Sequence, residues 1–280
     1  MQVFETIQEI KGYVSELREE ETSIGFVPTM GALHEGHLSL IECAKKENEA
    51  VIVSIFVNPV QFNNTEDLTR YPRDLQGDID KLKKRGVDTV FAPSVEEIYP
   101  DEVKKIYDFG KLDKVMEGAY RRGHFNGVAV VVHKLFDIVT PHIAYFGEKD
   151  FQQLAIIKKL VEQEQLNVRV KGCPIVRESD GLAMSSRNQR LSKEEREIAP
   201  IIYQTLKKAV ELKNTKTVDE IRRFVNETIE KSGDMKLEYF EMADSDTLLP
   251  IHSWSDSVNP RGFIAAYLGN VRLIDNIAFN

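Results

Sequence analysis

Strand-like and helix-like segments alternate along the first two thirds of the chain, and this alternation constrains the fold more than any other feature. The predicted strands cover residues 23–29, 50–57, 87–92, 143–146 and 168–176, and the predicted helices cover 37–46, 74–85, 127–139 and 151–165. Such alternation forms parallel βαβ units with right-handed crossovers. We therefore predict an α/β fold with a doubly wound, Rossmann-like parallel sheet.

The pattern changes near residue 186. Two helices are predicted at 193–212 and 218–232, and β-like segments follow at 236–244, 262–268 and 270–279. A run of helices followed by a run of strands is typical of an α+β unit. We expect a boundary within residues 178–191, which divides the chain into a larger domain, 1–185, and a smaller C-terminal domain, 186–280.

The composition excludes several classes of protein. The 280 residues carry 37 Lys and Arg against 45 Asp and Glu, and a net charge of −8 disfavours nucleic acid as the main partner. No apolar run approaches the roughly 20 residues of a membrane-spanning helix, and the charged N-terminal segment does not resemble a signal peptide. Cys43 and Cys173 are too few for a disulfide framework. We expect a cytoplasmic protein without a membrane partner.

The stretch TMGALHEGH, residues 29–37, directly follows the first predicted strand. Ligands of an open parallel sheet bind outside the carboxyl ends of its strands, where the next helix offers free N–H groups and a partial positive charge. Gly31 and Gly36 allow backbone to approach a ligand closely, and His34 and His37 lie on one side of the first helical turn. The stretch therefore predicts a phosphate-binding site.

Other interpretations of this stretch fit less well. It matches neither GxGxxG nor GxxxxGK[ST], the usual dinucleotide and P-loop patterns. HEGH places its histidines one residue closer together than the HExxH zinc motif does, which disfavours zinc. A pair of solvent-exposed histidines that only cap a helix remains an alternative.

HEGH resembles the HxGH signature of class I adenylating enzymes and nucleotidylyltransferases. The stretches FVPTMGALHEGH, SIFVNPVQF, YFGEKDFQQL and DGLAMSSRN occur in this order between residues 26 and 188, and together they resemble the pantothenate synthetase, or pantoate–β-alanine ligase, family. The C-terminal LGNVRLIDNIAF also fits this family. The resemblance implies an ATP-dependent ligase that condenses (R)-pantoate with β-alanine through a pantoyl-adenylate, releasing pyrophosphate and AMP. It also implies a homodimer, with ATP and pantoate bound by residues 1–185 and the smaller domain closing over the site.

The same resemblance assigns residues to the ATP site. The expected catalytic residues are His34, His37, Lys149 and Arg187. The expected ATP-binding residues come from three segments: Met30, Gly31, Ala32, Leu33, His34, Glu35, Gly36 and His37; Gly147, Glu148, Lys149 and Asp150; and Val176, Met184, Ser185, Ser186 and Arg187. Whether His37 transfers a proton or only donates a hydrogen bond stays open.

The chemistry of adenylate formation suits these residue types. A carboxylate becomes reactive toward an amine after it has attacked the α-phosphorus of ATP, and that step needs charge stabilised on the phosphate oxygens. Lys149 follows a predicted strand and would face the phosphates. Asp150 is expected to contact Mg²⁺, which takes one or two carboxylates in nucleotide sites. The residues alone leave an exposed Lys149–Asp150 pair as an alternative.

AMSSRN, residues 183–188, occupies the place of the KMSKS signature of the same superfamily. Ala183 replaces the first lysine of that signature, and a basic group appears instead at Arg187. This departure argues against an aminoacyl-tRNA synthetase. The residues alone also allow a polar loop between domains that binds nothing.

Gln61 and Gln153 are the predicted pantoate contacts by resemblance, and Gln61 is also expected to help seat β-alanine. A neutral amide offers donors and an acceptor to a small hydroxy acid without neutralising its carboxylate. Residues 120–126, which include Arg121 and Arg122, have the composition of an anion-contacting lid. A related nucleotidylyltransferase and a non-catalytic nucleotide-binding sensor are the alternative functions.

Overall fold

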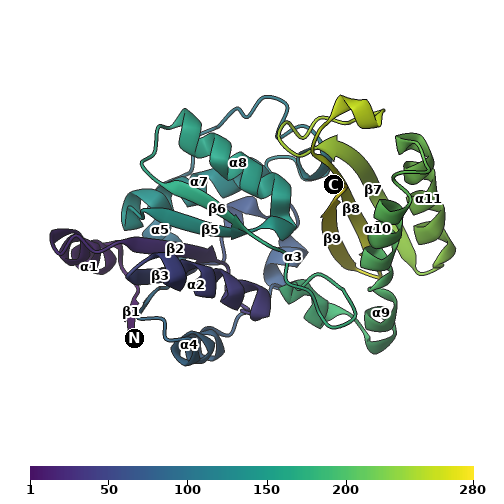
Figure 1. The fold of residues 1–280 in the computed structure, drawn as a ribbon. Coiled ribbons are helices and arrows are strands. Elements are labelled where there is room, and N and C mark those ends of the chain that lie inside the picture. The colour runs from purple at the N-terminus through teal and green to yellow at the C-terminus, as the bar shows by residue number, and fades with distance from the viewer. The chain divides into compact units, whose positions relative to one another are not determined.

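The computed structural model describes residues 1–280, and its main feature is a parallel sheet of six strands (Figure 1). The strand order is β1-β4-β3-β2-β5-β6. The strands are β1 (Gln2–Phe4), β2 (Ile24–Thr29), β3 (Ala50–Ile55), β4 (Thr89–Phe91), β5 (Ile143–Gly147) and β6 (Arg169–Cys173). The predicted doubly wound parallel sheet is confirmed.

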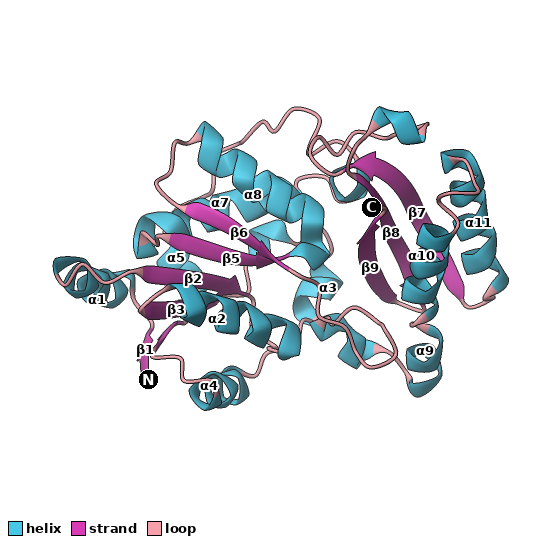
Figure 2. Ribbon diagram, viewed as in Figure 1, coloured by secondary structure: helices cyan, strands magenta, loops and turns pink.

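Helices connect these strands and cover the sheet on both sides (Figure 2). They are α1 (Ile7–Glu19), α2 (Glu35–Glu47), α3 (Thr65–Thr69), α4 (Leu75–Lys84), α5 (Val95–Ile98), α7 (His124–Val139) and α8 (Phe151–Gln163), with 3₁₀ turns η1 (Pro59–Gln61) and η2 (Glu148–Asp150). On one side, Ile41 of α2 and Leu82 of α4 share a hydrophobic cluster with Val53 of β3. Elsewhere α1 contacts α7.

No element was predicted for the first 19 residues, where the structure has β1 and α1. β1 has only three residues, too few for a periodic signal. The helix carried readable signals: Ile10, Val14 and Leu17 are buried at helical spacing, and Thr6 and Glu9 form a capping box.

The order of the strands reverses beside β2. The chain runs outward from β2 through β3 and β4, and it then returns to place β5 on the other side of β2. Gly25 pairs with Ile143 and Phe26 with Ala144, so β2 and β5 are direct neighbours. Ligands of doubly wound sheets bind at such a reversal, outside the carboxyl ends of the strands. TMGALHEGH follows β2 and GEKD begins at the end of β5, so both predicted motifs start at the reversal.

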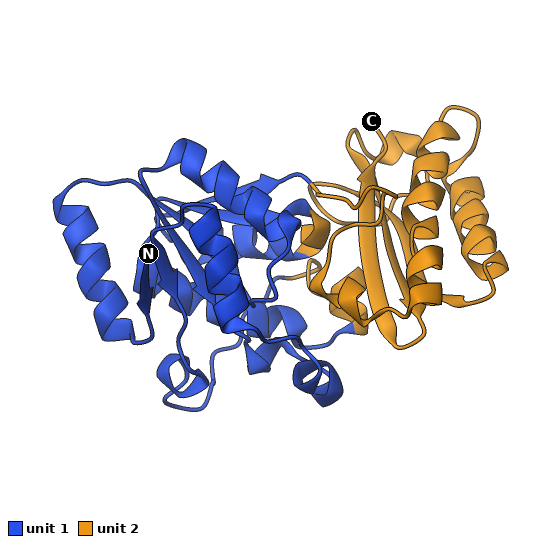
Figure 3. Cartoon of the chain, turned by 90° about the horizontal axis from the view of Figure 1, so that it is seen from below, with its two compact units in different colours: residues 1–109, 121–148, 153–174 blue, residues 110–120, 149–152, 175–280 orange.

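Contacts divide the chain into two compact units (Figure 3). Unit 1 comprises residues 1–109, 121–148 and 153–174, and unit 2 comprises 110–120, 149–152 and 175–280. The last segment of unit 2 begins at Ile175, just ahead of the range in which we expected a boundary. The functional division into domains 1–185 and 186–280 stays a prediction.

Unit 2 has the predicted α+β character. Its antiparallel sheet has the order β7-β8-β9. The elements are α6 (Met116–Tyr120), η3 (Ser186–Arg190), α9 (Lys193–Ile198), α10 (Ile201–Glu211), α11 (Val218–Lys231), β7 (Met235–Asp244), η4 (Trp254–Asp256), β8 (Pro260–Leu268) and β9 (Val271–Ala278). The single helix predicted over 193–212 is wrong: α9 ends at Ile198 and α10 begins at Ile201, because Pro200 has no N–H to continue the helical ladder.

An ion-pair cluster holds α6 within unit 2. Arg272 of β9 donates two hydrogen bonds to Glu117, at 2.8 and 2.7 Å, and its Nε donates to Glu238 at 2.9 Å. The hydroxyl of Tyr239 also donates to Glu117, at 2.7 Å. The side chains of Arg272 and Glu117 are only 16% and 10% exposed. Arg272 therefore bridges the two carboxylates.

Replacing Arg272 by Met should destabilise unit 2. The change removes the guanidinium that pairs with the buried Glu117 carboxylate and with Glu238, and breaking a buried pair in this way costs about 3–5 kcal/mol. Urea unfolding should show a loss of this size, whereas Lys231→Met, which removes an exposed pair with Glu227, should change the free energy of unfolding by less than about 1 kcal/mol. Equal effects of the two substitutions would contradict the role given to Arg272.

Candidate functional site

The HxGH turn fixes both histidine rings through the backbone. His34 is the N-cap of α2, and its Nδ1 accepts a hydrogen bond from the N–H of Gly36 at 3.1 Å. The Nδ1 of His37 accepts from the N–H of His34 at 3.4 Å, and the two ring centroids are 4.1 Å apart. A ring nitrogen that accepts a hydrogen bond carries no proton, so each neutral ring carries its proton on Nε2. The turn therefore supplies two N–H donors of defined orientation.

A buried carboxylate holds the loop that precedes this turn. Asp78 of α4 is 1% exposed and accepts hydrogen bonds from the N–H groups of Ala32, at 2.7 Å, and Leu33, at 2.8 Å. Gly31 and Ala32 have positive φ angles, +77° and +50°. This turn conformation keeps the N–H groups of Ala32 and Leu33 from forming β-sheet hydrogen bonds. A Cβ on Gly31 would lie 3.0 Å from Asp78 Oδ2, so this loop needs glycine. Asp78 was not predicted, although an acidic residue next to the apolar positions of a helix is a signal.

Gln61 is the predicted pantoate contact whose surroundings are best defined. It lies in η1, shortly after β3, and is 8% exposed. Its Nε2 donates to the sulfur of Met30 at 3.1 Å, and its Oε1 accepts from Asn58 Nδ2 at 3.0 Å. The structure thus brings Gln61 together with the first residue of the predicted ATP-binding segment.

Asn58 sets the orientation of the Gln61 amide. Its Nδ2 also donates to the carbonyl of Gly127 at 3.1 Å, and its Oδ1 accepts from the hydroxyl of Tyr99 at 2.8 Å. Because a carbonyl can only accept, the Asn58 amide has one satisfied orientation, and Gln61 must turn its oxygen toward Asn58. Burial raises the pKa of the Tyr99 hydroxyl, so that hydroxyl keeps its proton. The Gln61 N–H₂ group is therefore the part directed toward Met30.

Close packing fixes the backbone of the same segment. A Cβ on Gly127 of α7 would lie 2.5 Å from the carbonyl oxygen of Val60 and 2.7 Å from the Cα of Gln61. The carbonyl of Gln61 is also 2.8 Å from Nδ1 of His124. Asn58, Tyr99 and Gly127 were not predicted as site residues, because only the long-range packing of α7 gives them this role. His124 was predicted only as part of the lid 120–126, and the structure places it in α7, where it is buried.

The predicted site residues of unit 2 form two local structures. Lys149 and Asp150 lie in η2, with Nζ and Oδ2 3.8 Å apart, and the Lys149 side chain is 18% exposed against 47% for Asp150. In the AMSSRN segment, the N–H of Met184 donates to the carbonyl of Val176 at 3.0 Å. Ser185 caps η3 by accepting from the N–H of Arg187 at 3.2 Å. Val176 and the AMSSRN segment, both predicted to bind ATP, are thus held together.

The predicted site residues divide between the units. Unit 1 holds residues 30–37, 147, 148, 61 and 153, and unit 2 holds residues 149, 150, 176 and 184–187. Gln153 lies half-buried on α8, and the carboxylate of Glu35 bonds to Arg85 at 2.7 Å. The ligand contacts of all these residues stay predictions.

The residues fit a metal ion only in a limited way. The structure contains no group of three or more His, Cys, Asp or Glu side chains placed to hold a metal ion. Asp150, with a half-exposed carboxylate beside Lys149, can give a single ligand. That fits Mg²⁺, which in nucleotide sites takes most of its ligands from phosphates and water.

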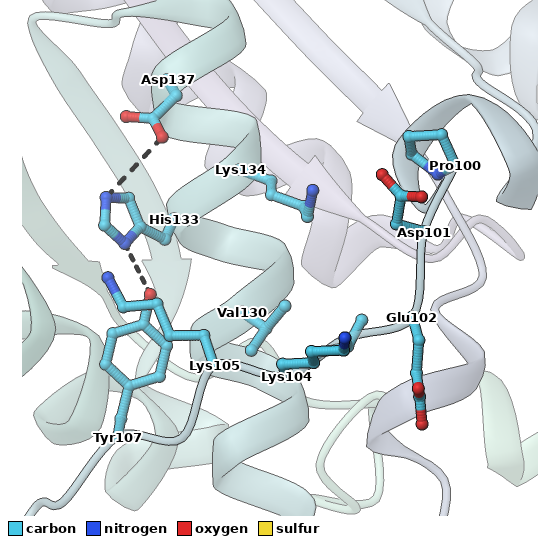
Figure 4. Close-up of a pocket in the computed structure, with 11 residues that line it drawn as sticks. Pro100, Asp101, Glu102, Lys104, Lys105, Tyr107, Val130, His133, Lys134 and Asp137 are labelled. Carbon is cyan, nitrogen blue, oxygen red and sulfur yellow. Dashed lines mark hydrogen bonds and ion pairs between the residues drawn. The ribbon is translucent and has the colours of Figure 1, made fainter.

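A cavity of about 330 Å³ lies elsewhere in unit 1, between residues 100–107 and α7 (Figure 4). Tyr107 and His133 line it, with the hydroxyl 2.6 Å from Nδ1, and Asp137 is 3.7 Å from the same ring. None of the predicted site residues lines this cavity. No helix in the structure has both the length and the apolar character to cross a membrane.

The strand order and the HxGH turn at the reversal define the class of protein: an α/β protein of the HxGH superfamily. Comparison with known protein families identifies one family within this class. The family model for pantoate–β-alanine ligase matches residues 2–278, and the chain belongs to this family.

Relatives and solved structures agree with this assignment. The pantothenate synthetase of Bacteroides fragilis is 50% identical over 279 residues, which cover 100% of this chain and 99% of the relative. The structure of pantothenate synthetase from Thermus thermophilus superposes with a TM-score of 0.93 at 43% identity, covering 99% of each chain. The pantoate–β-alanine ligase from Francisella tularensis, complexed with β-γ ATP and β-alanine, gives a TM-score of 0.84 at 41% identity, covering 99% of this chain and 97% of that one.

Replacing Asp78 by Ala should release the loop before the HxGH turn. Two buried N–H groups lose their acceptor, each at a cost of about 1–3 kcal/mol, so the free energy of unfolding should fall and ATP should bind more weakly. Calorimetric titration with ATP and urea unfolding measure both effects. Asp80→Ala is the matched control, since Asp80 is exposed on the same helix. Unchanged ATP affinity in a folded Asp78→Ala protein would contradict the link between this carboxylate and the site.

Proposed function

We propose that this protein is an ATP-dependent ligase that joins pantoate to β-alanine through a pantoyl-adenylate. The observation that carries the proposal is the match to the pantoate–β-alanine ligase family over residues 2–278, together with the HxGH turn at the reversal of strand order. The Francisella tularensis relative was solved with β-γ ATP and β-alanine, which supports ATP and β-alanine as ligands of this chain.

In the proposed first step, a carboxylate oxygen of pantoate attacks the α-phosphorus of ATP. A P–O bond to pantoate forms, the P–O bond to pyrophosphate breaks, and negative charge grows on the phosphate oxygens. The Nε2–H groups of His34 and His37, the ammonium of Lys149 and the guanidinium of Arg187 stabilise that charge as preorganised donors. Asp150 would hold a Mg²⁺ ion, which would neutralise charge on the phosphates.

In the proposed second step, the neutral amine of β-alanine attacks the acyl carbon of the adenylate. The C–N bond forms, the C–O bond to AMP breaks with its electron pair going to AMP, and the amine loses a proton to solvent. Gln61 holds pantoate by donating from the N–H₂ group that Asn58 directs toward Met30. Gln153 is the second proposed pantoate contact. The lid containing Arg121 and Arg122 would protect the adenylate from water.

We also propose a cytoplasmic homodimer. Bacterial relatives that share the full length of the chain carry the name of a biosynthetic enzyme, which supports a cytoplasmic location. Multi-angle light scattering of the purified chain tests the dimer. A single species at the mass of one chain would contradict it.

The first half-reaction is the most direct test. Pantoate with Mg-ATP alone should support exchange of labelled pyrophosphate into ATP, because adenylate formation is reversible before the amine arrives. His37→Ala and Lys149→Ala should each lower this exchange about 10² to 10³-fold while the fold persists. Exchange that requires β-alanine would contradict a free adenylate, and ATP binding without exchange would favour a nucleotide sensor. An adenylylated product that never forms the amide would favour a nucleotidylyltransferase.

A second prediction separates the adenylate from an enzyme-bound thioester. Cys173 is 2% exposed, and burial raises the pKa of its thiol to about 12, with neighbouring Cys43 adding to the shift. A thiol of that pKa is not the thiolate nucleophile that a thioester requires. The double variant Cys43→Ala, Cys173→Ala should therefore form pantothenate at a rate near that of the unchanged protein, measured by AMP release. A folded double variant that still exchanges pyrophosphate but forms no amide would overturn the direct attack of β-alanine.

A further inference from the structure

Lys149 is held through its backbone by the C-terminal sheet. It lies in η2, a turn of three residues, and its carbonyl oxygen accepts a hydrogen bond from Asn276 Nδ2 at 3.0 Å. Asn276 belongs to β9 and is 2% exposed. Both residues are part of unit 2. A side chain 127 positions further along the chain thus fixes the peptide group of the proposed phosphate-binding lysine.

A second residue fixes the orientation of the Asn276 amide. Arg261 of β8 donates from Nη1 to Asn276 Oδ1 at 2.6 Å. A guanidinium can only donate and a backbone carbonyl can only accept, so a flipped amide would lose both hydrogen bonds. The Asn276 nitrogen is therefore directed at the carbonyl of Lys149.

The same arginine also contacts the chain just after Lys149. Its guanidinium carbon lies 4.1 Å from the ring centroid of Phe151, the first residue of α8. Phe263 of β8 packs edge-on against that ring, with centroids 5.8 Å apart. The segment that carries Lys149 is thus held both at its own carbonyl and two residues later.

We propose that Asn276 and Arg261 are positioning residues for Lys149, which set the place from which its ammonium meets the phosphates of ATP. This inference rests on the proposed function of Lys149. A flexible lysine side chain stabilises a transition state fully only where the backbone that carries it is fixed. A displacement of about 1 Å can cost about 10²-fold in rate.

The test uses Asn276→Asp in the full-length protein. Aspartate keeps the shape of the side chain and its pairing with Arg261, but it places an oxygen opposite the Lys149 carbonyl. Pyrophosphate exchange at saturating substrates should fall about 10- to 100-fold, with the KM for pantoate unchanged. Leu273→Ala is the control for lost stability, since Leu273 is a buried residue of the same strand and belongs to a hydrophobic cluster that includes neither Asn276 nor Arg261. It should exchange pyrophosphate at a rate near that of the unchanged protein.

A double variant separates positioning from a general structural effect. If Asn276 acts through Lys149, adding Asn276→Asp to Lys149→Ala should lower single-turnover adenylate formation no further. Losses that multiply in the double variant would overturn the inference, as would a normal exchange rate in Asn276→Asp. Near-normal exchange in Lys149→Ala would instead refute the proposed role of the lysine itself.

Arg261→Met provides the second variant in case Asn276→Asp does not fold. Methionine keeps an apolar contact with Phe151 but removes the donor that orients Asn276. Arg261→Met should lower pyrophosphate exchange about 3- to 10-fold in a protein that keeps Lys149. It should not change the exchange rate of the Lys149→Ala variant. An equal fall in both backgrounds would overturn the inference.

Discussion

The reversal of strand order between β2 and β5 is the constraint on which the site depends. Right-handed crossovers carry the chain to opposite faces of the sheet on the two sides of this point, so the loops that leave β2 and β5 diverge. The loop from β2 leads into the helix that His34 caps, and the loop from β5 leads to Lys149. Two motifs separated by more than 100 residues thus begin at neighbouring strand ends because of topology alone.

The polar groups of the loops at this edge need hydrogen-bond partners outside the sheet. After β2 ends, the N–H groups of Ala32 and Leu33 have no partner in the sheet. The buried carboxylate of Asp78 accepts hydrogen bonds from both. Asn58, just after β3, joins a hydroxyl, an amide and a backbone carbonyl in one network that orients Gln61. An unpaired buried polar group is costly, so these partners fix the loops in one conformation. The side chains proposed to meet substrate are therefore held by residues that need not touch it.

Much of the fold was predictable from the sequence, because periodicity and turn chemistry are local. The βα alternation indicated the parallel sheet, and the glycines and histidines after the first predicted strand indicated the edge where we propose that ligands bind. Pro200 signals the break between α9 and α10, but the helical pattern on both sides of it led to the prediction of a single helix. The acidic residue Asp78 was visible among the apolar positions of its helix, but its hydrogen-bond partners, like those of Asn276, were not readable, since each contact is made with a loop 45 or more positions away. One boundary between the two units falls inside GEKD, after Glu148, and it likewise depends on contacts between residues far apart in the sequence.

The HxGH turn also bears on whether its histidines act as acids. An imidazolium carries a proton on both nitrogens, so protonating His34 would place Nδ1–H against the N–H of Gly36, 3.1 Å away. The same conflict arises between His37 and the N–H of His34. Two donors that face each other at a helix N-terminus, where the dipole already disfavours positive charge, make the cationic form unfavourable. A neutral ring can still donate from Nε2 to a phosphate oxygen without giving up its proton. If both histidines contact phosphate as proposed, this geometry favours hydrogen-bond donation over proton transfer.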